Sequence, residues 1–277
     1  MIVFDMMIEF PNINPVAIDL GFIQIRWYAI SYVTGILLSW FLILRIIKNK
    51  QIQINSEVIS ELISNSILGI ILGGRLGYVL FYNNEYFINN ILEIFKIWNG
   101  GMSFHGGLIG VIIATIYTSK KNKIPLLQLA DLVAVVAPIG IFFGRVANFI
   151  NGELYGRITT HPFGVIFPNG GILPRHPSQI YEASCEGLLL FFILFLSLQF
   201  KYIRNKTGIL TGLFIFFYGI IRFFIEFLRE PDDHIGLLYF DLSMGQFLCL
   251  PMILIGIFFI IFGFKKNNLI FNKTDIN

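Results

Sequence analysis

Long apolar runs separated by short polar connections make up the chain from residue 27 onward. A helix needs about 20 mainly apolar residues to cross a bilayer. Seven runs approach that length, at 27–44, 58–81, 102–119, 126–143, 180–200, 209–228 and 245–264. The pattern predicts an all-α integral membrane protein with seven transmembrane helices, in which residues 1–277 form a single polytopic membrane domain.

Composition supports this fold class. The chain is 56% hydrophobic and only 13% charged, whereas soluble domains carry about 25% charged residues. Its net charge of +3 is small and dispersed, so no nucleic-acid partner is expected. The two cysteines, Cys185 and Cys249, lie inside apolar runs, where buried packing is the expected role.

Basic residues fall mainly in alternate connections between the runs, and four segments carry three each. They are Arg45, Lys48 and Lys50; Lys120, Lys121 and Lys123; Lys201, Arg204 and Lys206; and Lys265, Lys266 and Lys273. The positive-inside rule places these segments in the cytoplasm, so the N-terminus is expected outside and the C-terminus inside. The longest outer segment, roughly 148–179, is expected to form a small extracytoplasmic cap, and residues 1–22 an interfacial arm.

Arginine dominates the basic positions that remain. Eight basic residues lie within the runs or in outer segments, and seven of the eight are arginine. They are Arg26, Arg75, Lys96, Arg145, Arg157, Arg175, Arg222 and Arg229. A planar guanidinium group binds phosphate through two parallel hydrogen bonds. The sequence therefore concentrates phosphate-binding side chains on the predicted outer side, where the positive-inside rule disfavours them.

The segment 144–157, with the sequence GRVANFINGELYGR, follows the fourth apolar run. It sets Arg145, Asn148 and Glu153 among glycines that include Gly156. A membrane span normally ends in a short polar turn, whereas this one ends in a concentration of hydrogen-bonding groups. We interpret the segment as a candidate site for a phosphate-bearing lipid headgroup at the edge of the bilayer.

The sixth apolar run carries a second polar group. Tyr218, Arg222, Glu226 and Arg229 fall on one stripe of a continuous helix. An Arg222–Glu226 pair would tie down the helix end. The same pair would also let Glu226 orient an arginine whose free edge faces a ligand, and the two interpretations are compatible.

Three further residues are candidates for chemistry. His105 precedes Gly106 and Gly107, which allow close approach of another backbone or a lipid. An unperturbed histidine pKa near 6.5 suits a general base, although an interfacial hydrogen-bonding role is also possible. Arg75 would bind phosphate or extend its charge to the interface, and Tyr28 would serve the site or an aromatic belt. No histidine spacing indicates a metal site.

Five segments together resemble the prolipoprotein diacylglyceryl transferases of bacteria. They are GGRLGYVLFYN at 73–83, GGMSFHGGLIG at 100–110, GRVANFINGELYGR at 144–157, LPRHPSQIYE at 173–182, and YGIIR at 218–222 followed by EFLR at 226–229. The resemblance implies transfer of a diacylglyceryl group from phosphatidylglycerol to the cysteine thiol of a lipoprotein signal peptide. The products are a thioether and glycerol-1-phosphate, and the site faces the outer side of the inner membrane.

The resemblance also assigns roles. Arg145 and Arg222 match arginines that act near the lipid phosphate, and His105 matches a proposed base. Other positions match residues important for activity or for binding phosphatidylglycerol. They are Tyr28, Arg75, Asn148, Glu153, Gly156, Tyr218, Glu226 and Arg229. No cofactor is implied, because the donor lipid already carries a leaving group.

Two other functions use the same features. A transporter for an anionic solute would use the arginines as its binding site, although no inverted repeat is evident. Another phospholipid-headgroup transferase would use them with a different acceptor. The family pattern is also altered slightly, since Ala147 and Tyr155 stand where glycine and tryptophan are common. Activation of the thiol by His105 or by nearby arginines is left open.

Overall fold

The computed structural model describes residues 8–265 except positions 12, 22, 23, 51 and 232–235. Lys266 and Lys273 of the predicted basic tail, and the first seven residues of the predicted arm, lie outside the described residues. The chain divides into two compact units. One comprises Met1–Leu42 with Asp131–Asn277, and the other comprises Ile43–Ala130.

All seven predicted runs are helical. They correspond to α1 (Trp27–Asn49), α2 (Ser56–Phe81), α4 (Phe104–Asn122), α5 (Leu126–Ile150), the run Ser178–Gln199, α9 (Ile209–Ile225) and α10 (Met244–Lys265). Within the described ranges, five are long and apolar enough to cross a membrane by themselves. The other two are α4, whose hydropathy is lower, and α9, which has only 17 residues. A mainly helical membrane protein is therefore confirmed.

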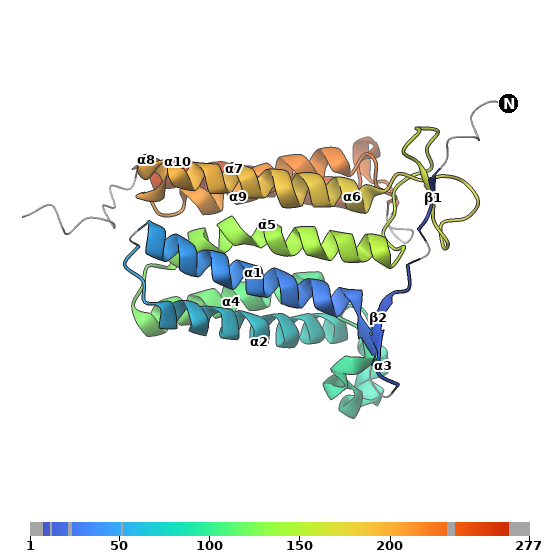
Figure 1. Cartoon of the computed structure of the whole chain (residues 1–277), viewed down its shortest axis with the longest axis horizontal. Helices are drawn as coiled ribbons and strands as arrows, with labels where there is room; N and C mark the ends of the chain where they lie inside the picture. Colours follow the sequence, from blue (N-terminus) through green and yellow to red (C-terminus); the bar gives the residue numbers. More distant parts are fainter. Residues whose placement is uncertain (1–7, 12, 22–23, 51, 232–235, 266–277) are drawn as a thin grey trace, which may run out of the picture. The chain divides into compact units, whose positions relative to one another are not determined.

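The run Ser178–Gln199 is built from three pieces. It starts as α6 (Ser178–Glu182), continues as the π-helical segment η4 (Ala183–Leu189) and ends as α7 (Leu190–Gln199). Figure 1 shows these pieces as one continuous rod, with α9 and α10 running beside it. A π-helical turn inside an α-helix often occurs at a functional site. The short helix α8 (Lys201–Arg204) follows.

Glycines and one carboxylate bring the helices of the first unit together. A Cβ atom on Gly256 would lie 2.6 Å from the backbone nitrogen of Phe216, so α9 and α10 pack in direct backbone contact. Asp131, near the start of α5, accepts hydrogen bonds from the backbone N–H groups of Gly208 at 2.7 Å and Thr211 at 2.8 Å. These groups begin α9, so a remote carboxylate caps that helix. Cys249 is buried and Cys185 half-buried, both as free thiols.

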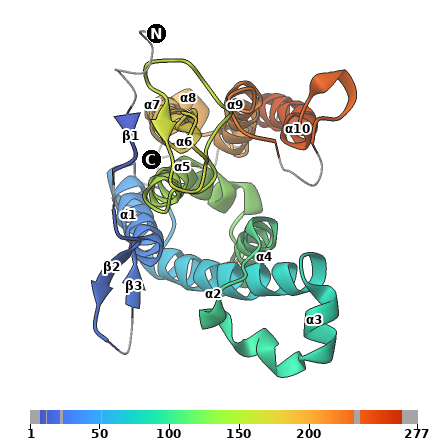
Figure 2. The ribbon, with the colours of Figure 1, turned by 90° about the vertical axis from the view of Figure 1, so that its right-hand side faces the viewer.

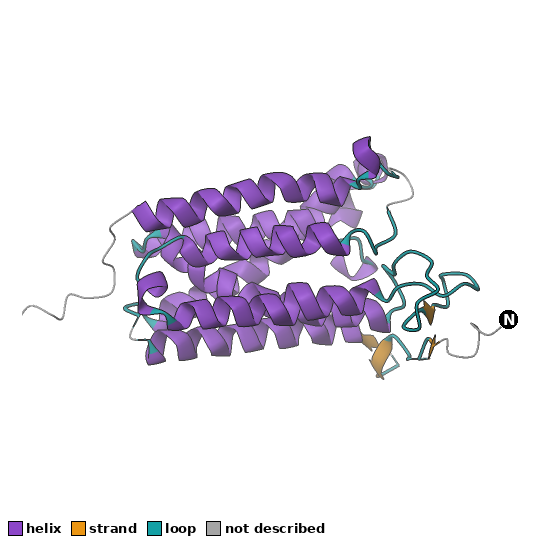
Figure 3. Cartoon of the chain, turned by 90° about the horizontal axis from the view of Figure 1, so that it is seen from above, coloured by secondary structure: helices purple, strands orange, loops and turns teal. Residues whose placement is uncertain are grey.

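The structure also contains short strands, which the all-α prediction did not include. β1 (Ile8–Glu9) pairs in parallel with β4 (Val165–Ile166), and β2 (Val16–Asp19) pairs antiparallel with β3 (Gln24–Arg26). The strands and the loops of the cap lie at one end of the helices of the first unit (Figure 3). Irregular backbone needs hydrogen-bond partners of its own, and the β1–β4 pairing ties the described part of the N-terminal arm to the cap.

The second unit is organised by close contact between α2 and α4. A Cβ atom on Gly106 would lie 2.1 Å from the carbonyl oxygen of Gly73, and one on Gly110 would lie 1.9 Å from that of Gly69. The expected close backbone approach at Gly106 is therefore confirmed. The chain between these helices runs out from α2 through α3 (Asn84–Asn89) and two 3₁₀ turns, η2 (Ile91–Phe95) and η3 (Ile97–Asn99), and returns to α4 (Figure 2).

Candidate active site

The last turns of α5 present Arg145 and Asn148 next to the cap. The side-chain amide of Asn148 donates to Glu153 Oε1 at 2.8 Å and to the hydroxyl of Tyr28 at 3.5 Å. Its carbonyl oxygen accepts from Arg145 Nη1 at 3.4 Å. Asn148, itself buried, therefore links three of the predicted residues, namely Arg145, Glu153 and Tyr28.

The turn after α5 returns Glu153 toward Asn148. Gly152 and Leu154 both have positive φ values, 64° and 57°. This conformation is ordinary for glycine and uncommon for leucine. The backbone N–H of Glu153 donates to the carbonyl oxygen of Asn148 at 3.1 Å, and Ser178 Oγ donates to that of Leu154 at 2.9 Å. Contacts with the end of α5 and the start of α6 thus hold the turn.

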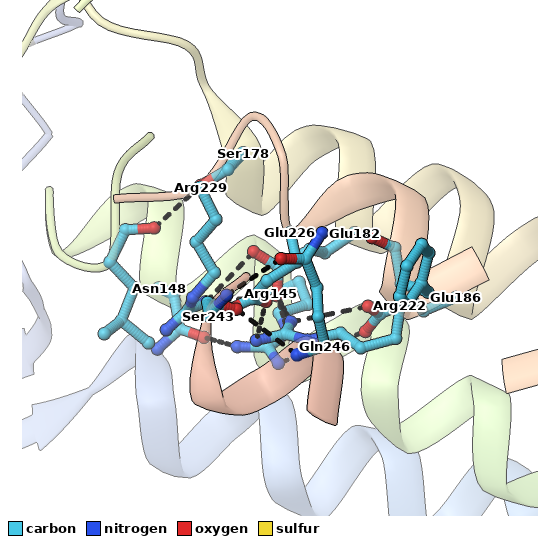
Figure 4. A network of polar contacts seen from close by, with 12 residues as sticks. Arg145, Asn148, Ser178, Glu182, Glu186, Arg222, Glu226, Arg229, Ser243 and Gln246 are labelled. Carbon is cyan, nitrogen blue, oxygen red and sulfur yellow. Dashed lines mark hydrogen bonds and ion pairs between the residues drawn. The ribbon is translucent and has the colours of Figure 1, made fainter. Parts of the chain in front are cut away.

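Three guanidinium groups converge on one carboxylate, that of Glu182 (Figure 4). Arg145 Nε lies 2.9 Å and Arg222 Nη1 lies 2.7 Å from Glu182 Oε2. Arg229 Nη1 lies 3.1 Å from Glu182 Oε1. The Glu182 side chain is completely buried, whereas Arg145, Arg222 and Arg229 are 20%, 15% and 13% exposed. The carboxylate is therefore internal, and part of each arginine is accessible.

Two more carboxylates complete the cluster. Glu186, one turn further along η4, lies 3.4 Å from Arg222 Nη1 and 4.0 Å from Arg145 Nη2. Glu226 lies 2.9 Å from Arg222 Nη2. The α6–η4 junction thus places Glu182 and Glu186 four residues apart with both facing Arg222.

The carboxylate of Glu226 is held from behind by the start of α10. Ser243 Oγ donates to Glu226 Oε1 at 3.1 Å. Gln246 Nε2 donates to the carbonyl oxygen of Phe223 at 3.3 Å, while its Oε1 accepts from the Ser243 backbone N–H at 2.9 Å. Ser243 and Gln246 are both buried. The expected Arg222–Glu226 pair is confirmed, and it belongs to a wider buried network.

The charged groups of the cluster pair with one another. Three arginines, Arg145, Arg222 and Arg229, meet three glutamates, Glu182, Glu186 and Glu226. Charges inside a membrane protein are costly unless they are paired, which explains the arrangement. A guanidinium group has five N–H donors, so carboxylate pairing still leaves donor capacity on the accessible side of each arginine.

The chain beyond α9 departs from the predicted helical stripe. The helix ends at Ile225, and Arg229 lies in a short bridge with Gly156. A Cβ atom on Gly156 would lie 2.3 Å from the carbonyl oxygen of Leu228. Arg157 N donates to that same oxygen at 2.9 Å. Gly156 therefore permits backbone packing between the cap and the segment that carries Arg229.

The cap has a charged contact of its own at Arg175. Its guanidinium group pairs with Glu230 at 2.9 Å and lies over the ring of Tyr155, 4.9 Å from the ring centroid. The next residue, His176, has a pKa lowered by burial and by the nearby charge of His161. The neutral imidazole is the form that suits this half-buried position.

Arg75 lies in the second unit, and its surroundings there are backbone carbonyls. The guanidinium group donates to the carbonyl oxygens of Glu93, Ile94, Lys96, Gly100 and Gly101. The residue is only 5% exposed and lies 5.0 Å from the centroid of the Phe87 ring. These contacts fasten the irregular segment between α3 and α4, a role that sequence reasoning did not consider.

His105 and Tyr218 have simpler surroundings. His105 is exposed in the first turn of α4, in the second unit, with its ring edge-on to Phe104. Tyr218 is half-buried on α9 of the first unit, one turn before Arg222, and stacks on Phe214 at 5.9 Å. Together with the residues above, the first unit assembles most of the predicted site: Tyr28, Arg145, Asn148, Glu153, Gly156, Tyr218, Arg222, Glu226 and Arg229.

Sequence reasoning missed four members of the network, Glu182, Glu186, Ser243 and Gln246. A usable signal existed for the first two. They stand four residues apart in an otherwise apolar run, and acidic residues within a span are rare unless they are paired or functional. Ser243 and Gln246 carried no such signal, because polar residues at a helix start are ordinary caps.

The helices and the site define a class of protein: a membrane protein with a largely buried arginine–carboxylate centre near the cap. Residues 15–262 match the family described as prolipoprotein diacylglyceryl transferase. The chain belongs to the prolipoprotein diacylglyceryl transferase family.

Named relatives agree with this assignment. The phosphatidylglycerol–prolipoprotein diacylglyceryl transferase of Rickettsia akari is 51% identical over 255 residues, covering 91% of this chain and 97% of the relative. The enzyme of that name from Rickettsia bellii is 50% identical, covering 91% and 96%. The one from Nitratidesulfovibrio vulgaris is 47% identical, covering 91% and 95%. Similarity of this extent spans the whole described site.

Proposed function

We propose that this protein transfers the diacylglyceryl group of phosphatidylglycerol to the cysteine thiol of a prolipoprotein signal peptide. The reaction releases glycerol-1-phosphate. The observation that carries the proposal is the convergence of Arg145, Arg222 and Arg229 at the cap end of apolar helices, in a chain of this family. Accessible guanidinium groups beside a bilayer suit the phosphate of a lipid headgroup.

The chemistry is a displacement at carbon. The peptide sulfur attacks the glyceryl carbon that carries the phosphate oxygen, a carbon–sulfur bond forms, and the carbon–oxygen bond breaks with its electron pair leaving on oxygen. The departing phosphate gains negative charge as it becomes a monoester. Donors aimed at that oxygen stabilise the transition state more than the ground state. Arg145 and Arg222 are assigned this task, with Asn148 and Glu226 orienting them. Arg229 adds binding for the headgroup.

The remaining candidates act around this centre. Tyr28 and Glu153 hold Asn148, and Gly156 lets Arg229 approach the cap. Tyr218 precedes Arg222 on α9 and would border the headgroup. Arg75 is assigned to the lipid-binding region through the loop that it fastens, without direct contact with phosphate.

Activation of the thiol is assigned to a general base. A free cysteine has a pKa of about 8.5, and the balance of three arginines by three glutamates limits the positive field that would lower it. His105 is the proposed base. His105→Gln should therefore lose most activity at pH 7 and recover much of it above about pH 8.5, where the thiol ionises unaided. A constant fractional loss at every pH would contradict this role.

The membrane arrangement is proposed from charge. Within the first unit, α8, which carries Lys201 and Arg204, lies at the end of the helices opposite the cap (Figure 1). By the positive-inside rule that end is cytoplasmic. We propose seven spans in the bacterial inner membrane, with α4 and α9 among them and with the N-terminus and the site on the outer side.

The decisive experiment supplies purified protein in phosphatidylglycerol-containing micelles with a lipobox peptide. Mass spectrometry should detect the diacylglyceryl thioether, and a peptide with serine in place of cysteine should stay unmodified. Arg145→Ala and Arg222→Ala should each abolish nearly all product. Lipid binding without thioether would favour another headgroup transferase, and solute flux through liposomes would favour a transporter.

A further inference from the structure

We propose that Glu182 is the positioning residue of the site. It is a buried counter-ion that holds three phosphate-facing arginines in fixed relative positions without touching the substrate. This inference rests on the proposed function. The structural basis is that Arg145, Arg222 and Arg229 each have a contact of 3.1 Å or less with this one carboxylate. Among the described residues, no other carboxylate pairs with all three.

The three arginines come from separate elements. Arg145 lies near the end of α5, Arg222 lies on α9, and Arg229 follows α9 in the bridge to the cap. Guanidinium groups brought this close repel one another, and the repulsion is strong where water is largely excluded. A carboxylate at their centre converts that repulsion into attraction. Glu182 is therefore what allows cations from α5, α9 and the cap to share one site.

Burial separates the role of Glu182 from that of the arginines. Its side chain has no exposed surface, whereas each of the three arginines keeps 13–20%. A phosphate group reaching the cluster would meet guanidinium N–H donors and not this carboxylate. Glu182 is the last residue of α6 and immediately precedes the π-helical segment η4, which starts at Ala183. That turn brings Glu186 to two of these arginines, Arg145 and Arg222, as a secondary partner.

The charge balance of the cluster allows a positioning role to be distinguished from a purely structural one by kinetics. Glu182→Gln keeps the shape of the side chain and removes one negative charge, so the cluster becomes more positive. An anionic headgroup and an anionic product should then bind at least as tightly as before, because a competitor for the guanidinium donors has been removed. The donors should nevertheless be less well aimed at the leaving oxygen. Turnover should fall while lipid affinity does not.

The test measures kcat and KM for phosphatidylglycerol at a saturating lipobox peptide, together with inhibition by glycerol-1-phosphate. For Glu182→Gln we expect kcat to fall by about 100-fold or more, as for loss of an oriented donor, with KM unchanged or lower. Inhibition by glycerol-1-phosphate should become stronger. Glu182→Asp keeps the charge with a shorter reach, and should recover part of kcat and restore the weaker product inhibition.

Glu61→Gln is the matched control. Glu61 pairs with Lys121 at 2.8 Å in the second unit, so the same substitution removes an ion pair that is not part of the cluster, and wild-type kinetics are expected. Wild-type kcat in Glu182→Gln would overturn the proposal. So would a raised KM with weaker product inhibition, because that pattern indicates collapse of the site.

The proposal and the proposed function fail in different ways. If the wild-type protein forms no thioether, the proposed function fails. Glu182 is then judged by glycerol-1-phosphate binding in calorimetry, which requires no acceptor peptide. Binding that is weaker in Glu182→Gln, or lost in both Glu182 variants, would refute the positioning role. If Glu182→Gln does not fold, Glu182→Asp carries the test, and an aspartate variant that matches Glu61→Gln in every constant would refute the role.

Discussion

Gly110→Ala should push α2 and α4 apart. The resulting loss of folding stability can be estimated from the interatomic distances where the two helices cross. A Cβ atom at Gly110 would lie 1.9 Å from the carbonyl oxygen of Gly69 and 2.4 Å from the carbonyl carbon, whereas ordinary contact begins at 3.4 Å. The backbones must part by about 1.5 Å at this point, because no side-chain rotation can relieve the clash. Overpacking typically costs about 1–3 kcal/mol, and a backbone clash belongs at the upper end of that range.

Alanine also has a better helix propensity than glycine, by about 1 kcal/mol. The net expectation for Gly110→Ala is therefore a destabilisation of about 2 kcal/mol after that gain. Gly107→Ala is the matched control on the same helix, because its Cβ atom would lie 3.8 Å from the nearest atom, the carbonyl oxygen of Ile70. This control should be neutral or slightly stabilising.

Thermal unfolding of both purified variants in one detergent measures the difference. Transfer activity is recorded in parallel, because His105 lies in the first turn of α4 and a displaced helix would move that side chain. We expect a lower unfolding temperature and lower activity for Gly110→Ala only. Equal unfolding temperatures for the two variants would refute the reasoning, since it depends entirely on the missing space at Gly110.

Three further outcomes are expected. Cys185→Ser with Cys249→Ser should keep activity, because the peptide supplies the nucleophile; an inactive double variant would instead indicate a covalent intermediate. Arg75→Lys should raise hydrogen exchange in the segment between α3 and α4, because an ammonium group cannot reach five carbonyls; unchanged exchange would contradict the fastening role. The pKa of His176 is lowered in the folded state, so its contribution to stability is complete above about pH 6.5 and declines as the pH falls below that value. His176→Gln should remove this acid sensitivity in unfolding measured across pH 5–8.

The sequence alone determined that this is a membrane protein and where the helices occur along the chain. Apolar length is a local property, and a bilayer requires it directly, so each predicted run is a helix in the structure. The predicted members of the site were found by a related argument, because an arginine in an apolar run is costly wherever it lies. Arg222 and Glu226 were therefore visible without any knowledge of the fold, and Arg145 was found from the concentration of hydrogen-bonding groups that follows the fourth run.

Only the tertiary structure decided which charges meet. The convergence on Glu182 depends on the relative placement of α5, the α6–η4 junction and the end of α9, and a residue pattern within one helix contains no information about that placement. The same limitation hid the surroundings of Arg75, whose carbonyl partners come from an irregular segment without periodicity. Local composition shows which types of side chain a site contains. Which charged side chains pair in a low-dielectric interior depends on distances of a few ångströms between separate elements.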